Sequence, residues 1–409
     1  MRALSYFLAL TFLWLTVGGC GGPSGDDAEE SSAAASTTSA AGTGVARWSV
    51  HRGDSALAGS VDVSFASQWS VDWTRLVAES PVTGLAVADD SIFACHADGT
   101  VARLPLSGGE PLWRRRLDAE LDAPPTIADS KLFVGTLDGA MMALRLVDGS
   151  TAWTHQTEDA IHGGANVAKT PDGETLLVFG SYDTNLYAVN LADGQLVWRH
   201  GTKNYVHGTP AVLGTSIVAT GCDGRVRRLN SADGDEVFSI AASSYIPGAP
   251  AVSDSLTLVT GHDGTTAAVD NSSGTLAWSM KQDPPNHTFV LSPAVNATQV
   301  VTASQNGKVF CRELADGALT WKVDLPSPST AAPLMGRQTV LFGTQDGTLE
   351  QLALATGEAV SSTTVGAAIS CDLAVTPHGI LLGTEQGLLA HVIAANQRPK
   401  TNRGKKSPR

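Results

Sequence analysis

Cysteine is scarce in this sequence, and no two cysteines lie close together along it. The chain has five cysteines in 409 residues, and no two of them are adjacent or form a CxxC motif. Beyond Cys20 they stand at intervals of 127, 89 and 60 residues, as Cys95, Cys222, Cys311 and Cys371. This spacing lacks the pattern of a disulfide framework, so we expect buried free thiols.

Charged residues are also few, at 16%, and the 27 Lys and Arg are outnumbered by 40 Asp and Glu, which gives a formal net charge of −13. Six of the basic residues lie in residues 398–409, so the rest of the chain carries a charge of about −19. An acidic body argues against nucleic acid as a partner. The basic tail at 398–409 is predicted to be solvated and disordered.

One long apolar run stands at the N-terminus. Met1-Arg2 and the apolar stretch at 3–17 have the form of a secretory signal. The stretch is shorter than the apolar length typical of a transmembrane helix. It ends in Val17-Gly18-Gly19-Cys20, which resembles a bacterial lipobox. We therefore predict a signal peptide over 1–20 and a lipid on Cys20.

The segment after the lipobox supports an anchored protein. Residues 21–44 are acidic and then rich in Ser, Ala and Thr, with no large apolar side chain, which predicts a disordered tether. Gly21, rather than Asp, follows the cysteine. The expected location is therefore the cell envelope, at the outer membrane and facing the periplasm.

A short turn recurs along the chain with a period of about 40 residues. It stands as Asp98-Gly99, Asp138-Gly139, Asp183-Thr184, Asp223-Gly224, Asp263-Gly264, Asn306-Gly307, Asp346-Gly347 and Gln386-Gly387. Asp-Gly and Asn-Gly tolerate positive φ at both central positions of a type I′ turn. Each copy lies between short apolar runs and therefore predicts a hairpin.

A second turn follows ten or eleven residues later, and a large aromatic residue usually stands four residues beyond its glycine. The series is Trp113, Trp153, Trp198, Phe238, Trp278, Trp321 and Ser361. Upstream of the hairpins, segments such as Pro210-Ala211-Val212 recur. Together these features predict four strands per unit.

Four-stranded units in series predict an all-β fold, an eight-bladed β-propeller over residues 45–397. The indoles are predicted to wedge between neighbouring blades, with their N–H groups close to backbone carbonyls. The last unit, from about 368 to 396, supplies three strands, and the segment at 69–76 reads like the missing outer strand. We expect this N-terminal strand to complete the last blade and remove the open edge.

Several segments resemble the repeat of the pyrroloquinoline-quinone (PQQ) repeat propellers. They are AVNLADGQLVW at 188–198, ALRLVDGSTAW at 143–153 and AVDNSSGTLAW at 268–278. In addition, WSVHRGDSALAG at 48–59 looks like the W-x-x-x-R-G-D segment of the lipoprotein branch that includes the outer-membrane assembly factor BamB.

The resemblance implies two different functions. Quinoprotein dehydrogenases hold PQQ and Ca²⁺ in the central channel, beside a catalytic Asp and usually two adjacent cysteines. This chain has no adjacent cysteines and only short insertions, so we expect no PQQ, no Ca²⁺, no metal and no catalytic residues. The lipoprotein branch fits better, and it implies a non-enzymatic ring that binds a protein partner in the cell envelope, such as a β-barrel assembly complex. We expect this propeller to be monomeric. A quinoprotein-type oxidoreductase and a sensor of small ligands or polysaccharides are the alternatives.

Polar residues gather on one face of the predicted ring. In a four-stranded meander, the turn between the second and third strands shares a face with the link to the next blade. The candidate channel-face residues are His162, Tyr182, Asp183, His207, Cys222, Asp223, His262 and Cys371. Imidazole and thiolate suit zinc, but no tight pair such as His-x₃-His occurs, so we expect the polar lining of a wet channel mouth.

Two insertions interrupt the repeat and are candidate partner-binding loops. The first lengthens the inner hairpin of blade 3 near Lys169 and Asp172. The second lengthens the link into blade 6 and contains Asp283, Asn286 and His287. No G-x-S-x-G elbow, P-loop or dinucleotide fingerprint occurs, so the sequence offers no catalytic candidate.

Overall fold

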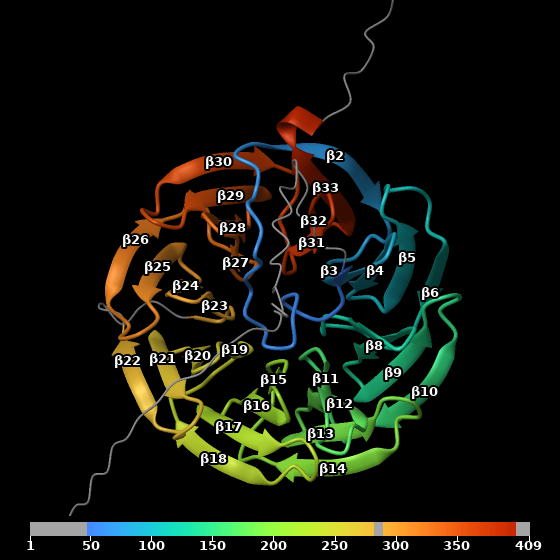
Figure 1. The fold of residues 1–409 in the computed structure, drawn as a ribbon. Coiled ribbons are helices and arrows are strands. Elements are labelled where there is room, and N and C mark those ends of the chain that lie inside the picture. Colours follow the sequence, from blue (N-terminus) through green and yellow to red (C-terminus); the bar gives the residue numbers. More distant parts are fainter. Residues whose placement is uncertain (1–46, 282–288, 398–409) are drawn as a thin grey trace, which may run out of the picture. The chain divides into compact units, whose positions relative to one another are not determined.

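The computed structural model describes residues 47–281 and 289–397, and these residues lie in one compact unit. The strands of this described part form eight antiparallel sheets, which follow one another around a ring (Figure 1). In most sheets the first strand lies at the centre of the ring and the last at its circumference. The predicted eight-bladed β-propeller is confirmed.

The first four blades have these strands: β1 (Arg47–Trp48), β3 (Val82–Ala88), β4 (Ser91–His96), β5 (Thr100–Pro105), β6 (Trp113–Arg116); β7 (Thr126–Ala128), β8 (Lys131–Gly135), β9 (Ala140–Arg145), β10 (Thr151–Gln156); β11 (Asn166–Lys169), β12 (Thr175–Gly180), β13 (Asn185–Asn190), β14 (Leu196–Gly201); β15 (Ala211–Leu213), β16 (Ser216–Thr220), β17 (Arg225–Asn230), β18 (Glu236–Ala241).

The other four have these: β19 (Ala251–Val252), β20 (Leu256–Thr260), β21 (Thr265–Asp270), β22 (Leu276–Lys281); β23 (Ala294–Val295), β24 (Gln299–Ala303), β25 (Lys308–Glu313), β26 (Leu319–Asp324); β27 (Leu334–Met335), β28 (Thr339–Gly343), β29 (Thr348–Ala353), β30 (Ala359–Thr364); β31 (Ala374–Thr376), β32 (Gly379–Gly383), β33 (Leu388–Ala394), β2 (Trp69–Leu76).

The apolar core lies between successive blades. A middle strand such as β20 is buried along its whole length, because both faces of its blade are covered by neighbours. An outer strand such as β22 alternates instead, with Trp278 buried and Ser279 exposed. This alternation is the expected pattern for a strand with one face toward solvent.

The turns between the second and third strands differ from the expectation. Gly99 has a φ of 87°, but Asp98 is not among the residues with positive φ, so the turn is not type I′. Instead the N–H of Gly99 donates to the carbonyl of His96 at 3.0 Å, which makes a tight turn followed by a left-handed glycine. The Asp98 carboxylate accepts the N–H of Thr100 at 3.0 Å, so the aspartate stabilises the turn.

The tryptophans join neighbouring blades as predicted. The indole N–H of Trp198 donates to the carbonyl of Ser231 in the next blade at 2.8 Å, and Trp321 donates to Leu354 in the same way, also at 2.8 Å. Trp113, Trp153 and Trp278 make the equivalent bond. Each indole therefore combines apolar burial with a hydrogen bond across a blade interface.

The ring closes through β2, which pairs with β33 and completes the eighth blade. One residue of β2 also supplies an indole to blade 7, where Ser361 stands in place of a tryptophan. Trp69 is buried, and its indole N–H donates to Oε1 of Gln351, which also accepts the hydroxyl of Ser361. Ring closure thus restores an indole to the blade that lacks its own.

The only helix in the described residues is a 3₁₀ turn at Ala395–Gln397. None of the helical structure there has the length and apolar character needed to span a membrane. The predicted signal at 1–20, tether at 21–44, Cys20 and tail at 398–409 lie outside the described residues.

Candidate functional site

The centre of the ring is filled by residues 47–63, which we call the plug segment. Figure 1 shows the chain before β2 running across the middle of the ring. Carbonyl groups of the plug segment accept backbone N–H groups from the inner strands of five blades, at 2.6–2.9 Å. The pairs are Ser49 with Ile127, Ser55 with Val212, Ala56 with Val252, Ala58 with Val295 and Gly59 with Met335. β1 adds a fifth strand to blade 1, and the Asn166 amide of blade 3 donates to Ser55.

The R-G-D part of the plug segment has a local structural role. Arg52 and Gly53 both have positive φ, of 63° and 95°. A Cβ at Gly53 would overlap the Trp48 ring, so glycine allows that indole to pack against the turn. Asp54 accepts the N–H of Ala58 at 3.1 Å. The motif therefore builds a compact turn inside the channel.

His51 and Arg52 attach the plug segment to blades 4, 6, 7 and 8. His51 Nε2 lies 2.9 Å from Oδ2 of Asp372, and its Nδ1 lies 3.1 Å from the hydroxyl of Thr209. Arg52 is 3% exposed, and its Nη2 donates to the carbonyls of Pro293 at 2.8 Å and Pro333 at 3.2 Å. Its Nη1 lies 3.8 Å from Asp372.

Asp372 is the anionic centre of this arrangement. Burial opposes its ionisation, but the hydrogen bond from His51 and the charges of His51 and Arg52 outweigh burial and lower its pKa to about 2. Its Oδ1 also accepts the N–H of Ala332 at 2.7 Å. The carboxylate thus holds the plug segment through His51 and Arg52 and also bonds the backbone of blade 7.

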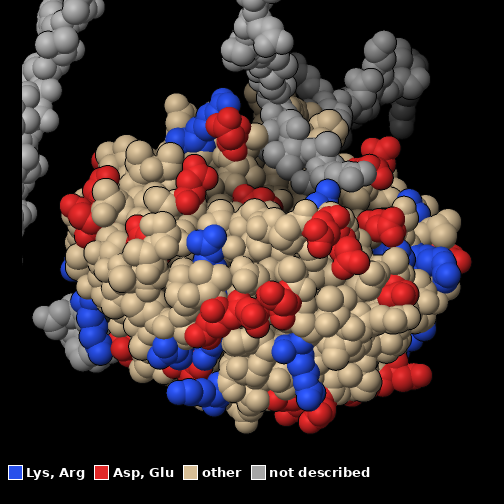
Figure 2. All heavy atoms as spheres, turned by 60° about the horizontal axis from the view of Figure 1, so that its bottom comes forward, with Lys and Arg blue, Asp and Glu red and all other residues tan. Residues whose placement is uncertain are grey.

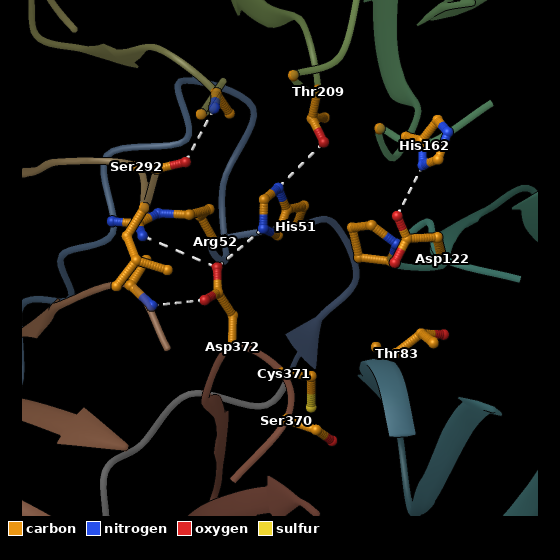
Figure 3. A pocket seen from close by; sticks show the side chains of 18 of the residues that line it. His51, Arg52, Thr83, Asp122, His162, Thr209, Ser292, Ser370, Cys371 and Asp372 are labelled. Carbon is orange, nitrogen blue, oxygen red and sulfur yellow. Dashed lines mark hydrogen bonds and ion pairs between the residues drawn. The ribbon is translucent and has the colours of Figure 1, made fainter. Parts of the chain in front are cut away.

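A cavity of about 400 Å³ opens at one mouth of the channel, with Trp48, His51 and Arg52 of the plug segment among its lining (Figure 3). Eight residues of its wall, one from each blade, occupy the same position of the repeat. In chain order these residues are Val82, Asp122, His162, His207, Pro247, Val290, Thr330 and Ser370. The mouth is therefore apolar at some blades and polar at others, with the carboxylate and both imidazoles on blades 2, 3 and 4.

The polar side of the mouth is a connected group of rings. The Asp122 carboxylate accepts from Nδ1 of His162 at 2.8 Å, and the Tyr182 hydroxyl is hydrogen-bonded to Nδ1 of His207 at 2.7 Å. Tyr182 lies between His162, at a centroid distance of 4.1 Å, and Tyr205, at 4.4 Å and an interplanar angle of 6°. Tyr205 is 44% exposed and forms the outer end of this stack.

The electrostatics of the group are set by burial and hydrogen bonding. The hydrogen bond from His162 lowers the pKa of Asp122, so this carboxyl is ionised at neutral pH. Burial and the nearby His162 lower the pKa of His207, so this imidazole is neutral there. Burial raises the pKa of Tyr182 to about 12. The mouth offers two ionised carboxylates, Asp122 and Asp372, the second of them close to Arg52, together with neutral donors and acceptors.

The structure brings together four of the eight predicted channel-face residues and places the other four elsewhere. His162, His207 and Cys371 line the cavity, and Tyr182 touches it through His207. Burial raises the pKa of the Cys371 thiol to about 12, so it is a poor nucleophile. Cys95, Cys222, Cys311 and Cys371 are all buried and free, as expected.

The other predicted residues lie away from the cavity wall. Asp183 accepts the N–H of Asn185 at 3.0 Å and the hydroxyl of Tyr187 at 2.6 Å, and Asp223 pairs with Arg227. Cys222 is also absent from the described wall, and His262 packs edge-on against Tyr245 with a centroid distance of 5.6 Å. The two aspartates thus have structural roles in their turns.

The candidate partner loops are only partly described. Lys169 ends β11, Asp172 lies in the exposed turn before β12, and both side chains are exposed. Asp283, Asn286 and His287 lie outside the described residues. Their role in binding a partner stays a prediction.

Sequence reasoning missed the residues that hold the plug segment. His51 and Arg52 lie in a segment that was recognised only by resemblance, and Asp372 stands two residues beyond the repeat position of Ser370. Asp122 precedes His162 by one repeat period of 40 residues, so the repeat register could have identified it. No three His, Cys, Asp or Glu side chains within the described ranges are grouped to hold a metal ion.

Comparison with known proteins gives a family match and several similar structures. A family model described as outer membrane protein assembly factor BamB matches residues 54–205, 183–298 and 290–368. No curated protein matches the sequence. BamB from Moraxella catarrhalis has a TM-score of 0.69 at 18% identity, over 80% of this chain and 100% of that chain.

Enzymes and a designed protein share the same architecture. A quinohemoprotein alcohol dehydrogenase from Comamonas testosteroni has a TM-score of 0.73 at 12% identity, over 85% of this chain and 80% of that one. The computationally designed protein Ika8 has a TM-score of 0.65 at 19% identity, over 78% and 97%. At such identities the likeness establishes the fold, and function depends on the local site.

Proposed function

Because this chain belongs to the PQQ-repeat β-propeller family of the outer membrane protein assembly factor BamB, we propose that it is a non-enzymatic scaffold that binds a protein partner in the cell envelope. In this proposal a lipid on Cys20 anchors the chain to the outer membrane, on the periplasmic side. The tether at 21–44 gives the ring freedom to reach its partner. The proposed partner is the machinery that assembles outer-membrane β-barrels.

The filled channel is the observation that carries a non-enzymatic role. The resemblance places the cofactor of the quinoprotein dehydrogenases in the central channel, where this chain has its own plug segment. The plug segment contacts every blade, either through backbone hydrogen bonds or through the side chains of Asn166 and Asp372. Such a closed centre supports a rigid ring whose outer surfaces are available for binding.

The chemistry of the cavity does not fit PQQ, which is a quinone that bears carboxylates. Arg52 is the one Arg or Lys among the described residues that line it, and that guanidinium already faces Asp372 and two carbonyls. Asp122 and Asp372 also line the cavity and would repel the carboxylates of PQQ. We therefore propose that the chain uses no PQQ.

The surface of the ring is compatible with a protein partner. Figure 2 shows small groups of acidic and basic side chains interspersed over the surface in view. A mixed surface of this kind gives specific contacts through charge complementarity. The turn at 170–173 extends from blade 3 into open space, since a Cβ on Gly173 would meet no other atom within 4 Å. We propose this turn as a contact point.

Two experiments test the proposal. Crosslinking of the full-length chain in envelope membranes, followed by capture, is expected to recover components of outer-membrane β-barrel assembly, and recovery of no envelope protein contradicts a scaffold role. Incubation with PQQ, Ca²⁺, a primary alcohol and an artificial electron acceptor is expected to give no turnover. Alcohol oxidation above the heat-denatured control contradicts a non-enzymatic role.

A further inference from the structure

We propose that the cavity at the channel mouth binds the hydroxyl-rich ring of a neutral saccharide. The cavity has a volume of about 400 Å³, which falls in the range of small-molecule pockets, roughly 300–1,000 Å³. It therefore fits a small molecule, and this binding is separate from the proposed binding of a protein partner. Three observations carry the inference. They are the mixture of donors and acceptors on the wall, an exposed aromatic face next to the cavity and the local charge.

The wall matches the hydrogen-bonding pattern of a sugar. Each sugar hydroxyl both donates and accepts, so it is best met by a carboxylate together with imidazoles and hydroxyls. Asp122 supplies the carboxylate, His162 and His207 the imidazoles, and Thr330 and Ser370 hydroxyl oxygens, all on the wall of one cavity. Figure 3 shows Asp122, His162, Thr209 and Asp372 around this space, on segments from different blades.

The rim supplies a flat apolar surface. Tyr182 and Tyr205 stack almost in parallel at 4.4 Å, and His162 supports the inner side of Tyr182 at 4.1 Å. This support fixes the plane of Tyr205, whose side chain is 44% exposed. Neither tyrosine is among the lining residues of the cavity, and Tyr182 separates Tyr205 from His162. The exposed face of Tyr205 therefore packs against the C–H face of a further sugar unit outside the cavity, while the unit inside it meets Asp122 and the imidazoles.

Local charge favours a neutral ligand over an anionic one. Asp122 and Asp372 both carry negative charge on the lining, while Arg52 is the single permanent cation there among the described residues. Asp372 lies close to Arg52, which compensates its charge. Asp122, on the far wall, bonds to His162, and no Arg or Lys of the described lining compensates its charge. A sugar acid or a phosphate would bring a further negative charge against these carboxylates.

The binding test uses the full-length chain with N-acetylglucosamine, glucose, glucuronate and an N-acetylglucosamine tetrasaccharide as probes. Titration calorimetry and saturation-transfer NMR are expected to show saturable binding of at least one neutral probe. Tighter binding of the tetrasaccharide than of its monomer identifies the end of a glycan chain as the ligand, and equal binding identifies a free sugar. Lack of saturation by every neutral probe, or preference for glucuronate, overturns the proposal.

Variants locate the site independently of folding defects. Asp122→Asn is expected to weaken binding of the neutral probe about tenfold, and Tyr205→Ala is expected to weaken binding of the tetrasaccharide about tenfold, because each removes one major contact. Tyr205→Phe keeps the aromatic face and is expected to bind like the parent. His378→Ala alters a different cavity and serves as the control. Equal binding by Tyr205→Ala, Asp122→Asn and the control, with native circular dichroism, overturns the assignment. A missing protein partner with intact sugar binding would reject the scaffold role alone.

Discussion

His51 and Asp372 lie 321 residues apart in the chain and meet inside the ring, with Nε2 2.9 Å from Oδ2. One belongs to the plug segment and the other to blade 8, which is completed by the N-terminal strand β2. The same carboxylate faces Arg52 and accepts the Ala332 N–H from blade 7. A single side chain therefore couples channel filling to ring closure.

Removal of the Asp372 charge is expected to destabilise the fold. Asp372→Asn leaves the buried Arg52 guanidinium without its carboxylate. Because the side chain of Asp372 is 24% exposed, we expect the free energy of unfolding to fall by about 2–3 kcal/mol, which is less than the loss for a fully buried pair. Chemical denaturation monitored by tryptophan fluorescence measures this. Asp324→Asn is the matched control. It removes an exposed ion pair with Lys308 and is expected to cost under about 1 kcal/mol. Equal effects of the two variants contradict the role of Asp372.

The contribution of Asp372 is expected to depend on pH. Its pKa is about 2 in the folded chain, below the ordinary value of 3.8, so the unfolded chain takes up the proton first as pH falls. The stabilisation is therefore fully present above about pH 4 and is lost between about pH 4 and pH 2. The difference in unfolding free energy between the parent and Asp372→Asn should shrink across this interval. A constant difference would show that the carboxylate charge is not the cause.

A methyl group at Gly59 is expected to disturb the plug segment. Gly59 has a φ of 61°, and a Cβ there would overlap the Arg52 guanidinium, which would have to leave the carbonyls of Pro293 and Pro333. Gly173 has a φ of 88° but open space around it, so Gly173→Ala bears only the backbone cost of about 1 kcal/mol. Thermal unfolding should show Gly59→Ala as less stable than Gly173→Ala by at least about 2 kcal/mol.

Trp69 is expected to stabilise the junction between blades 7 and 8. Trp69→Ala removes a buried indole and should cost about 3–5 kcal/mol. Trp69→Phe keeps most of the packing, as Phe238 does in blade 4, and should cost about 1 kcal/mol for the lost bond to Gln351. Urea unfolding of both variants checks the ranking. Equal losses would mean that the ring volume of Trp69 is unimportant.

Much of the fold could be predicted from the sequence because a propeller repeats a local signal. The Asp-Gly turns and the indoles marked each blade, and the likeness of residues 69–76 to other outer strands indicated how the ring closes. The type of turn could not be read from the dipeptide. Asp-Gly suits both a type I′ turn and a type I turn with a left-handed glycine, and only the backbone angles separate them.

The site was less predictable because it depends on convergence around an axis. His162 and His207 were found because the repeat register placed them at the start of inner strands. The plug segment matches no repeat, and its partners are backbone groups from distant blades. The role of Asp372 is evident only from its contacts with His51 and Arg52 in the folded chain. Local sequence patterns contain no information about such contacts.

Hydrogen exchange of the full-length chain tests most directly the claim that the plug segment closes the channel. The amides of Ile127, Val212, Val252, Val295 and Met335 donate to the plug segment, so their exchange should be as slow as that of the middle strands. Gly59→Ala should speed their exchange, whereas Gly173→Ala should leave it unchanged. Exchange of these five amides in the parent chain at the rate of exposed loops would contradict the account.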